Sequence, residues 1–282
     1  MANTRELRRR IRSVKNTSQI TKAMQMVAAT KMRRAQAQAL LGRPYIENLT
    51  LALSELSGKI NTELHPLLRE NKTDSVGLLL LTTDKGLCGA LNTNLFRLTQ
   101  SFISEKRNVQ VFTIGKKGRQ FVVRTSRDLK ADFENPEIVT FRQASLSAKL
   151  LIDAFLLGEL KEVYLIYPHF ISTLRQEPTL RKILPVDSTM LSPASSSSEF
   201  IFEPDPDTLL DFVLTHSVEA RIYSALLETK ASEHSARMMA MQNATDNAKE
   251  LVEDLSLEYN QTRQQAITNE LLEITTAQAA LE

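Results

Sequence analysis

The sequence predicts an α/β protein: a long antiparallel coiled coil of the N- and C-terminal helices, plus a central Rossmann-like α/β domain with a mostly parallel sheet. Three observations support this prediction. Residues 1–41 and 207–282 contain neither glycine nor proline, the residues that most often break helices. Both stretches place small or apolar residues at coiled-coil spacing. Between them, strand-length apolar runs alternate with helical segments, as in domains built on a parallel sheet.

The two terminal stretches are too long to be buried inside one ordinary domain. At a rise of ~1.5 Å per residue, a helix over residues 1–41 reaches ~60 Å, and one over residues 207–282 exceeds ~100 Å. Helices of this length need a second long helix or a partner protein to cover their apolar side. We therefore expect a mechanical or scaffolding role.

A seam of positions spaced alternately by four and three residues runs along each terminal stretch. The seam residues are smaller and more polar than those of a leucine zipper, which allows the helices to approach closely. A helix that lies on a globular core has similar spacing, so this alternative stays open. The N-terminal seam is Leu7, Ile11, Val14, Ser18, Thr21, Gln25, Ala28, Met32, Ala35 and Ala39, and the C-terminal seam is Met241, Thr245, Ala248, Val252, Leu255, Tyr259, Thr262 and Ala266.

The two ends of the chain carry opposite charge, although the net charge is only +2. Residues 1–43 hold eleven basic residues and one acidic residue, a balance of +10. Residues 205–282 hold five basic and fourteen acidic residues, a balance of −9. Opposite charges favour an antiparallel pair and guide charged partners. The cluster Arg5, Arg8, Arg9, Arg10 and Arg12 also allows a nucleic-acid-binding interpretation, but no recognition module accompanies it.

The central elements follow from apolar runs bounded by glycine and proline. Residues 76–83 form a continuous apolar run, as expected for a strand buried on both faces. Further strands are expected at 109–114, 138–141, 162–167 and 179–186, and helices at 91–104, 116–123 and 145–160. An additional helical region is expected at 42–69 and a surface loop at 192–198. The predicted domains are 1–58 and 207–282, the coiled-coil helices, and 74–190, the α/β domain.

Composition excludes several classes of protein. Cys88 is the single cysteine, so no intramolecular disulfide can form, which suits a reducing compartment. No apolar run approaches the roughly eighteen residues needed to span a bilayer, so we expect any membrane association to go through a partner.

Residues 82–92, Thr-Thr-Asp-Lys-Gly-Leu-Cys-Gly-Ala-Leu-Asn, are the candidate nucleotide site. The segment lies between a predicted buried strand and a helix, where α/β enzymes often bind phosphate. Its glycines, Gly86 and Gly89, match neither the dinucleotide-binding spacing nor a P-loop. The stretch 115–118 fails the same comparison. The favoured interpretation is a tight turn that needs glycine, with a nucleotide site as the alternative.

No catalytic residue, metal ligand or cofactor is assigned. His65, His169, His216 and His234 lack metal-ligand spacing, and each is expected at the surface or in a helix cap. Cys88 as a nucleophile would need a base that the sequence does not identify. Methionines at positions 238, 239 and 241 suit either packing or an adaptable contact surface.

Several motifs resemble the gamma subunit family of F-type ATP synthases. The N-terminal motif is residues 11–24, IRSVKNTSQITKAM, continued by MVAATKMRRA at 26–35. The central motif is DKGLCG at 84–89, and the C-terminal motifs lie at 236–241, 244–248, 260–264 and 267–273. The resemblance covers nearly the whole chain, and its terminal motifs are the most specific. One departure is Ala277-Gln278, where the family usually has Gly-Ala, which affects only the tip of the helix.

The resemblance implies the central shaft of a rotary motor. The helices would lie on the axis of the alpha/beta ring, and the α/β domain, with the epsilon subunit, would rest on the membrane c-ring. Catalysis would belong to the beta subunits, so this chain would be no enzyme, bind no cofactor and occur once per complex. The chain lacks the inserted cysteine pair of light-regulated plastid members, so thiol switching is not expected. The motif begins almost at Met1, which favours a bacterial type, peripheral on the cytoplasmic face of the plasma membrane.

The resemblance also implies roles for particular residues. Contacts that couple the shaft to the alpha/beta ring are expected at Met24, Arg237, Arg263, Gln264, Thr268, Glu270 and Glu273. Contacts with the c-ring and epsilon are expected at Phe200, Phe202 and Glu203. The alternatives are an α/β nucleotide-binding enzyme with helical extensions and a basic coiled-coil protein that binds nucleic acid. The family resemblance favours the shaft, with no nucleic acid as partner.

Overall fold

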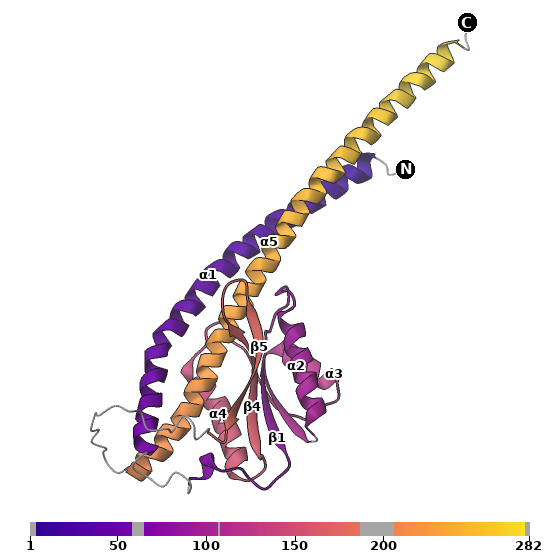
Figure 1. Cartoon of the computed structure of the whole chain (residues 1–282). Helices are drawn as coiled ribbons and strands as arrows, with labels where there is room; N and C mark the ends of the chain where they lie inside the picture. The colour runs from indigo at the N-terminus through magenta and orange to yellow at the C-terminus, as the bar shows by residue number, and fades with distance from the viewer. Residues whose placement is uncertain (1–3, 58–64, 107, 187–205, 280–282) are drawn as a thin grey trace. The chain divides into compact units, whose positions relative to one another are not determined.

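The computed structural model describes residues 4–57, 65–106, 108–186 and 206–279. The chain divides into two compact units, one of residues 1–28 with 237–282 and the other of residues 29–236. Two long helices, α1 (Thr4–Ser57) and α5 (Pro206–Ala279), contribute to both units (Figure 1). The two terminal stretches without glycine and proline are therefore helical, as predicted.

Helix α1 continues through Gly42 and Pro44 to Ser57, close to the end of the helix predicted at 1–58. The helical region expected at 42–69 is therefore helical as far as Ser57, as part of α1, and Pro66–Leu68 form a short 3₁₀ helix. A proline inside a helix removes one backbone hydrogen bond and normally kinks the helix. Beyond it, Leu53 and Leu56 are fully buried in the core of the second unit. Their burial offsets the local cost, because most helical stability in proteins comes from tertiary packing.

The second unit contains one five-stranded sheet in the order β3-β2-β1-β4-β5. The first four strands, β1 (Val76–Leu81), β2 (Val109–Ile114), β3 (Leu129–Phe133) and β4 (Glu162–Phe170), are parallel to their neighbours. The edge strand β5 (Gln176–Leu184) is antiparallel to β4. This is the mostly parallel α/β sheet that the sequence predicts.

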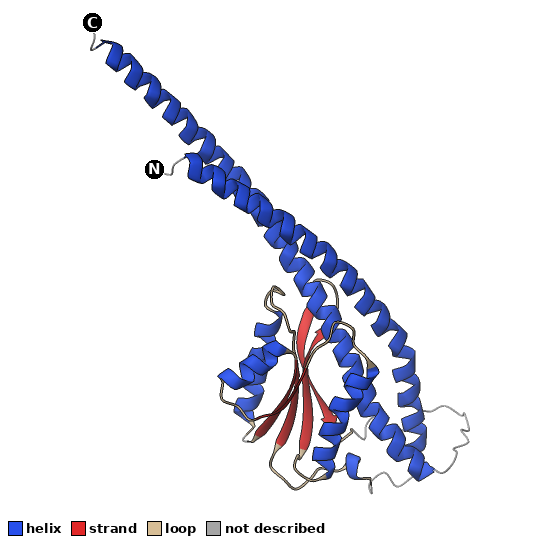
Figure 2. Ribbon diagram, turned by 180° about the vertical axis from the view of Figure 1, so that it is seen from behind, coloured by secondary structure: helices blue, strands red, loops and turns tan. Residues whose placement is uncertain are grey.

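Helices cover both faces of the sheet (Figure 2). On one face, α2 (Leu91–Glu105) and α3 (Lys116–Arg124) pack on alternate residues of β1, such as Leu78 and Leu80. The opposite face packs Leu79 and Leu81 against α4 (Phe141–Leu156), α5 and the end of α1. A short 3₁₀ helix, η2 (Pro66–Leu68), adds Leu67 to the same core. The continuous apolar run in β1 thus reflects burial on both faces.

One predicted strand is wrong, and the sequence does not predict the strand that forms this edge of the sheet. Residues 138–141 form no strand; Ile138 is exposed, and α4 begins at Phe141. The strand β3 instead lies at Leu129–Phe133, where half-buried and exposed residues alternate. This alternation is the expected signature of an edge strand with one covered face, and a search for apolar runs does not detect it. The loop predicted at 192–198 lies outside the described residues.

Candidate functional site

The first unit is an antiparallel helix pair, as predicted. Thr21 Oγ1 and Thr245 Oγ1 share a buried hydrogen bond of 2.7 Å. An Arg8 Nη2 group donates to the Tyr259 hydroxyl at 2.7 Å, and its guanidinium also lies over that ring. Because the earlier residue of α1 meets the later residue of α5, the helices run in opposite directions.

The interface of the pair is built from small and medium-sized residues. Leu7, Ala28, Met241, Ala248 and Leu255 are buried in it. Every predicted seam position within this unit is buried or half-buried, except the last. Ala266 is exposed, so the prediction of its place in the seam is wrong. The reason is geometric: α1 starts at Thr4 and its Arg8 already reaches Tyr259, so α5 extends beyond its partner.

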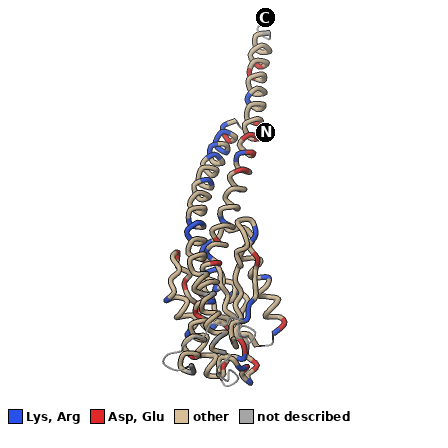
Figure 3. The backbone as a smooth tube through the Cα atoms, turned by 60° about the vertical axis from the view of Figure 1, so that its left-hand side comes forward, with Lys and Arg blue, Asp and Glu red and all other residues tan. Residues whose placement is uncertain are grey.

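The charge asymmetry of the sequence maps onto this helix pair. Figure 3 shows lysine and arginine gathered along the N-terminal part of α1, and acidic residues along the later part of α5. The Arg8–Tyr259 contact uses a phenol hydroxyl as acceptor. The opposite charges of the two helices add a longer-range attraction between them and toward charged partners.

The residues predicted to couple the shaft to its partners fall into two groups. Met24 and Arg237 are half-buried in the helix pair. The other five lie on the part of α5 beyond the seam, where residues 263–278 are all exposed. Helical periodicity places Arg263 and Glu270, seven residues apart, on one side, and Gln264 and Thr268, four apart, on the neighbouring side. Glu273 is exposed on the same stretch, and Phe200, Phe202 and Glu203 lie outside the described residues.

Sequence reasoning placed Thr21 and Thr245 in the two seams but did not pair them across the interface. The C-terminal seam contains two threonines, Thr245 and Thr262, so the sequence alone does not single out Thr245 as the partner of Thr21. A threonine pair of this kind satisfies both hydroxyls inside the helix interface, where an unpaired hydroxyl would be costly.

The loop after β1 forms a closed structure that leaves no open phosphate cradle. The Thr82 hydroxyl accepts a hydrogen bond from the Gly118 amide at 2.8 Å, and Asn135 Nδ2 donates to the Thr82 carbonyl at 2.6 Å. Next to them, Asn92 Nδ2 donates to the Thr83 hydroxyl at 2.8 Å. These bonds tie β1 to the start of two helices and to the segment before α4, as expected for a structural turn.

The position that an anion would take at the start of α3 is occupied by a carboxylate of the chain itself. Asp84 Oδ1 accepts a hydrogen bond from the Lys116 amide at 2.8 Å. Free amides and the helix dipole make such an N-terminus attractive to anions, and Asp84 satisfies it. The turn itself places Gly89 at φ 58° and Leu87 at φ 61°, so Gly89, rather than Gly86, is the glycine that the backbone requires.

The remaining candidates for chemistry are structural. Cys88 is buried, and Asn92 Nδ2 lies 3.4 Å from its sulfur. His65 caps η2 through Nδ1, as expected, whereas His234 is buried and does not lie at the surface. Within the residues that the structure describes, no cluster of three metal-ligating side chains occurs. A search of these same residues finds no helix with the length and apolarity that a membrane span requires.

Comparison with solved structures identifies the class of protein. The chain is similar to one from the central stalk/c-ring of the mitochondrial ATP synthase of Tetrahymena thermophila, with 27% identity, a TM-score of 0.62, and coverage of 80% of this chain and 99% of the other. A chain of the Euglena gracilis mitochondrial ATP synthase shares the fold, with a TM-score of 0.73, 20% identity and coverage of 99% and 94%. The helix pair and α/β domain are those of ATP synthase rotor stalks.

Sequence comparison identifies the particular family. A family model described as ATP synthase matches residues 3–281. The ATP synthase gamma chain of Opitutus terrae is 42% identical, with 99% of each chain covered, and that of Methylacidiphilum infernorum is 45% identical, with 100% of each chain covered. The chain belongs to the ATP synthase gamma chain family. It is a non-catalytic subunit, and the two alternative functions raised from the sequence are set aside.

Proposed function

We propose that this chain is the central rotor shaft of an F-type ATP synthase, which transmits torque between the ion-driven membrane c-ring and the catalytic alpha/beta ring. The observation that supports this function most directly is the antiparallel helix pair closed by Thr21–Thr245 and Arg8–Tyr259, in a chain of the gamma family. A pair of helices resists twisting and bending better than one helix. Torque applied at one end is therefore delivered at the other.

The partners follow from this role. They are the alpha and beta subunits, the epsilon subunit and the c-ring, with one copy of this chain in each complex. ATP is made or hydrolysed on the beta subunits, and ion flow through the c-ring drives or follows rotation. The chain is part of the F1 portion. We infer further that it works on the cytoplasmic face of a bacterial plasma membrane, because the similar curated gamma chains come from bacteria.

We infer that three segments divide the task. Residues 1–58 and 207–282 would form the shaft, and residues 74–190 would form the domain that meets epsilon and the c-ring. Residues 200, 202 and 203 would contribute two aromatic rings and a carboxylate to the c-ring and epsilon contact.

The coupling contacts would lie on α5 beyond the seam and at the Met24 and Arg237 positions. Arg263 is exposed and can donate charge-assisted hydrogen bonds to an acidic loop of a beta subunit. Gln264 offers a donor and an acceptor beside it. Thr268, Glu270 and Glu273 continue this surface toward the C-terminal end of α5. One short stretch of α5 would therefore contact the beta subunits one after another as the shaft turns.

The double substitution Arg263→Ala, Gln264→Ala tests this assignment in a reconstituted complex. Neither side chain belongs to the α1–α5 seam, so assembly with alpha and beta chains should be retained. We expect the ratio of ion pumping to ATP hydrolysis to fall severalfold, measured in membrane vesicles. The neighbouring exposed residue Gln265 provides a control, and Gln265→Ala should leave this ratio unchanged. An unchanged ratio in the double variant would remove these two residues from the coupling contact.

A further inference from the structure

A small cavity in the second unit lies apart from the shaft contacts and from the loop after β1. Its volume is about 150 Å³. Liquid water takes ~30 Å³ per molecule, so the cavity has room for a small solute with a few waters. Its lining comes from α1, from the segment before α4 and from α5, and includes Lys31, Arg34, Glu137, Lys230 and His234.

The charges around this cavity favour an anion. Three cationic side chains, Lys31, Arg34 and Lys230, line it together with the Glu137 carboxylate, and Glu233 lies next to it, 3.4 Å from Lys230, so three cations face two carboxylates. Lys31 pairs with Glu137. Among the described residues, no carboxylate lies within ion-pair distance of Arg34, so its planar fork of donors is available for an oxyanion.

Lys230 is the most deeply placed of the three cations. Its side chain is 7% exposed, and Nζ donates to the Asn135 carbonyl at 3.3 Å and to Glu233 Oε2 at 3.4 Å. Both distances exceed the ~2.7–2.9 Å of strong charge-assisted bonds. An ammonium has three donors, and two long bonds satisfy a buried charge poorly. A further acceptor in the cavity would complete the coordination of Lys230.

Glu137 shows that the site already attracts negative charge. The hydrogen bond and the charge of Lys31 lower the pKa of the Glu137 carboxyl, with smaller contributions from His234 and Lys85, while burial acts weakly in the opposite direction. The Glu137 side chain is 62% exposed, so it can leave Lys31 at little packing cost. Its carboxylate therefore acts as an internal competitor for any anion that enters.

We propose that this cavity binds inorganic phosphate, with Arg34, Lys31 and Lys230 as its donors and Glu137 as the group that it displaces. Arg34 binds two phosphate oxygens through its fork, and the two lysines neutralise the remaining charge. The proposed ligand is the free ion, because the cavity has room for little more than one phosphate group and its waters. By linkage, phosphate then stabilises the folded second unit by RT ln(1 + c/Kd), where c is the phosphate concentration, so the stabilisation rises with phosphate concentration. This site is independent of the rotor role.

Titration of the full-length chain with sodium phosphate at constant ionic strength, followed by calorimetry, tests the proposal. We expect saturable binding of one phosphate per chain. Arg34→Gln should weaken binding by about tenfold or more, the loss of one bidentate charged contact. Glu137→Gln should tighten binding severalfold, because it removes the competing carboxylate. Circular dichroism confirms that each variant is folded.

Arg33→Gln is the matched control, because Arg33 is exposed, adjacent in sequence and not part of the cavity lining. Its phosphate affinity should equal that of the unaltered chain. Equal weakening by Arg33→Gln and Arg34→Gln would indicate diffuse binding to a basic surface and overturn the proposal. So would the absence of saturation, or a Glu137→Gln variant that binds no tighter. Displacement of phosphate by equimolar ATP would overturn the restriction to the free ion.

Discussion

Gly115, which follows β2, packs so closely on Thr82 at the end of β1 that only glycine fits at this position. Its backbone has a φ of 109°, which residues other than glycine rarely adopt. A Cβ placed there would lie 2.3 Å from the Thr82 carbonyl oxygen, a backbone atom that cannot move aside cheaply. Gly86, in the loop after β1, has no atom within 4 Å of the corresponding position. Two glycines that look alike in sequence thus have different requirements.

Gly115→Ala should destabilise the α/β domain by about 2–4 kcal/mol, the sum of backbone strain and displacement of the Thr82 strand end. The measurement is the urea midpoint of the full chain, followed by circular dichroism. Gly86→Ala is the control and should change stability by less than about 1 kcal/mol. Equal stability of the two variants would contradict the close packing of Gly115 on Thr82.

The substitution Met24→Lys tests how tightly the helix pair fits the surrounding subunits at this position. Met24 is half-buried in the helix pair, and a lysine there can extend its ammonium outward while its alkyl chain keeps the packing. We expect the variant to assemble with alpha and beta subunits but to couple poorly, because the new cation can pair with an acidic beta segment and hold one rotary angle. The measurement is the ratio of ion pumping to ATP hydrolysis. Val27→Lys, at an exposed position of the same helix, is the control, and normal coupling by Met24→Lys would argue against a tight fit at this position.

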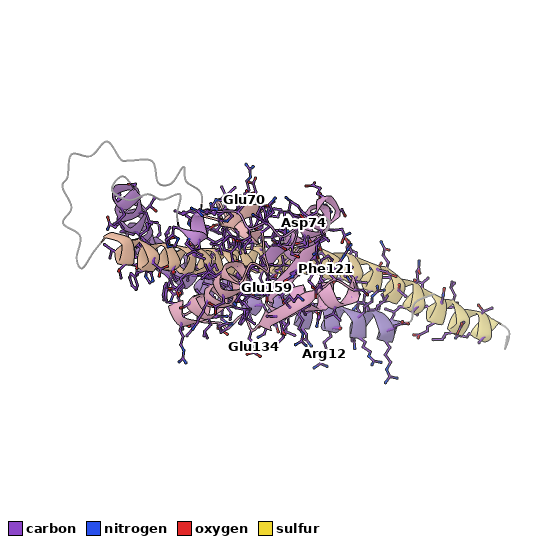
Figure 4. The ribbon with its side chains drawn as sticks, turned by 90° about the horizontal axis from the view of Figure 1, so that it is seen from below. Arg12, Glu70, Asp74, Phe121, Glu134 and Glu159 are labelled. Carbon is purple, nitrogen blue, oxygen red and sulfur yellow. The ribbon has the colours of Figure 1, made fainter. Side chains whose placement is uncertain are left out.

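Among the elements, the edge pair β4–β5 carries a charge cluster that sets its response to pH. Lys182 Nζ lies 2.7 Å from Glu162 Oε1, and Tyr164 donates to the other carboxylate oxygen at 3.1 Å. Burial raises the pKa of Glu162, but the hydrogen bond and charge of Lys182 outweigh it, so the net pKa is lowered from about 4.5. Glu70, labelled in Figure 4, adds a second carboxylate 3.4 Å from Lys182.

A carboxyl with a lowered folded-state pKa stabilises the fold above its unfolded pKa, and this contribution is lost as pH falls through the folded value. The Glu162 contribution should therefore be complete at neutral pH and decline below about pH 4.5. Glu162→Gln should lower the urea midpoint at pH 7 and flatten its dependence between about pH 5 and 3. Glu159→Gln, an exposed residue also labelled in Figure 4, should leave the midpoint at pH 7 nearly unchanged. A parallel pH profile for Glu162→Gln would count against this role.

The helix pair illustrates how a weak seam suits rotation. Burial of one large apolar side chain contributes ~1.5–3 kcal/mol, so an anchor that fits the sleeve at one angle would favour that angle. Thr262 is half-buried and Ala266 is exposed, so leucine at these positions would meet the surrounding subunits with little effect on α1.

Thr262→Leu combined with Ala266→Leu should slow ATP-driven rotation in a single-molecule assay and lengthen pauses at particular angles. Ser104→Leu, an exposed site on α2, controls for added apolar surface. If the double variant turns at the unaltered speed, small residues at positions 262 and 266 are not required for smooth rotation.

For the whole molecule, the sequence predicts the long helices and the parallel sheet from patterns that extend over many residues, and it predicts the family from several motifs along the chain. The seams recur every three or four residues, and β1 is apolar throughout. What the sequence does not predict depends on tertiary packing. Strand β3 has only alternate residues covered, and α1 continues past Pro44 to Leu53 and Leu56, which are buried in the core. The role of Asp84 as a cap on α3 depends on a contact between distant residues, which no local pattern contains.

The candidate site, like the fold, can be predicted only in part from the sequence. The exposed surface of α5 is predictable, because a helix longer than its partner must end alone. Its individual coupling residues are predicted only through the family resemblance, since solvent-exposed side chains satisfy no constraint within the chain. The phosphate cavity has no sequence signature at all: its cations come from positions 31, 34 and 230, which only the fold brings together.

The unequal lengths of the two long helices have a consequence for the life of the protein in the cell. Residues 263–278 are bare on every side until other subunits enclose them. A newly made copy that finds no ring would present this end to degrading enzymes, whereas an incorporated copy would hide it. Surplus shafts would thus be removed selectively, which would help to keep one axle for each motor.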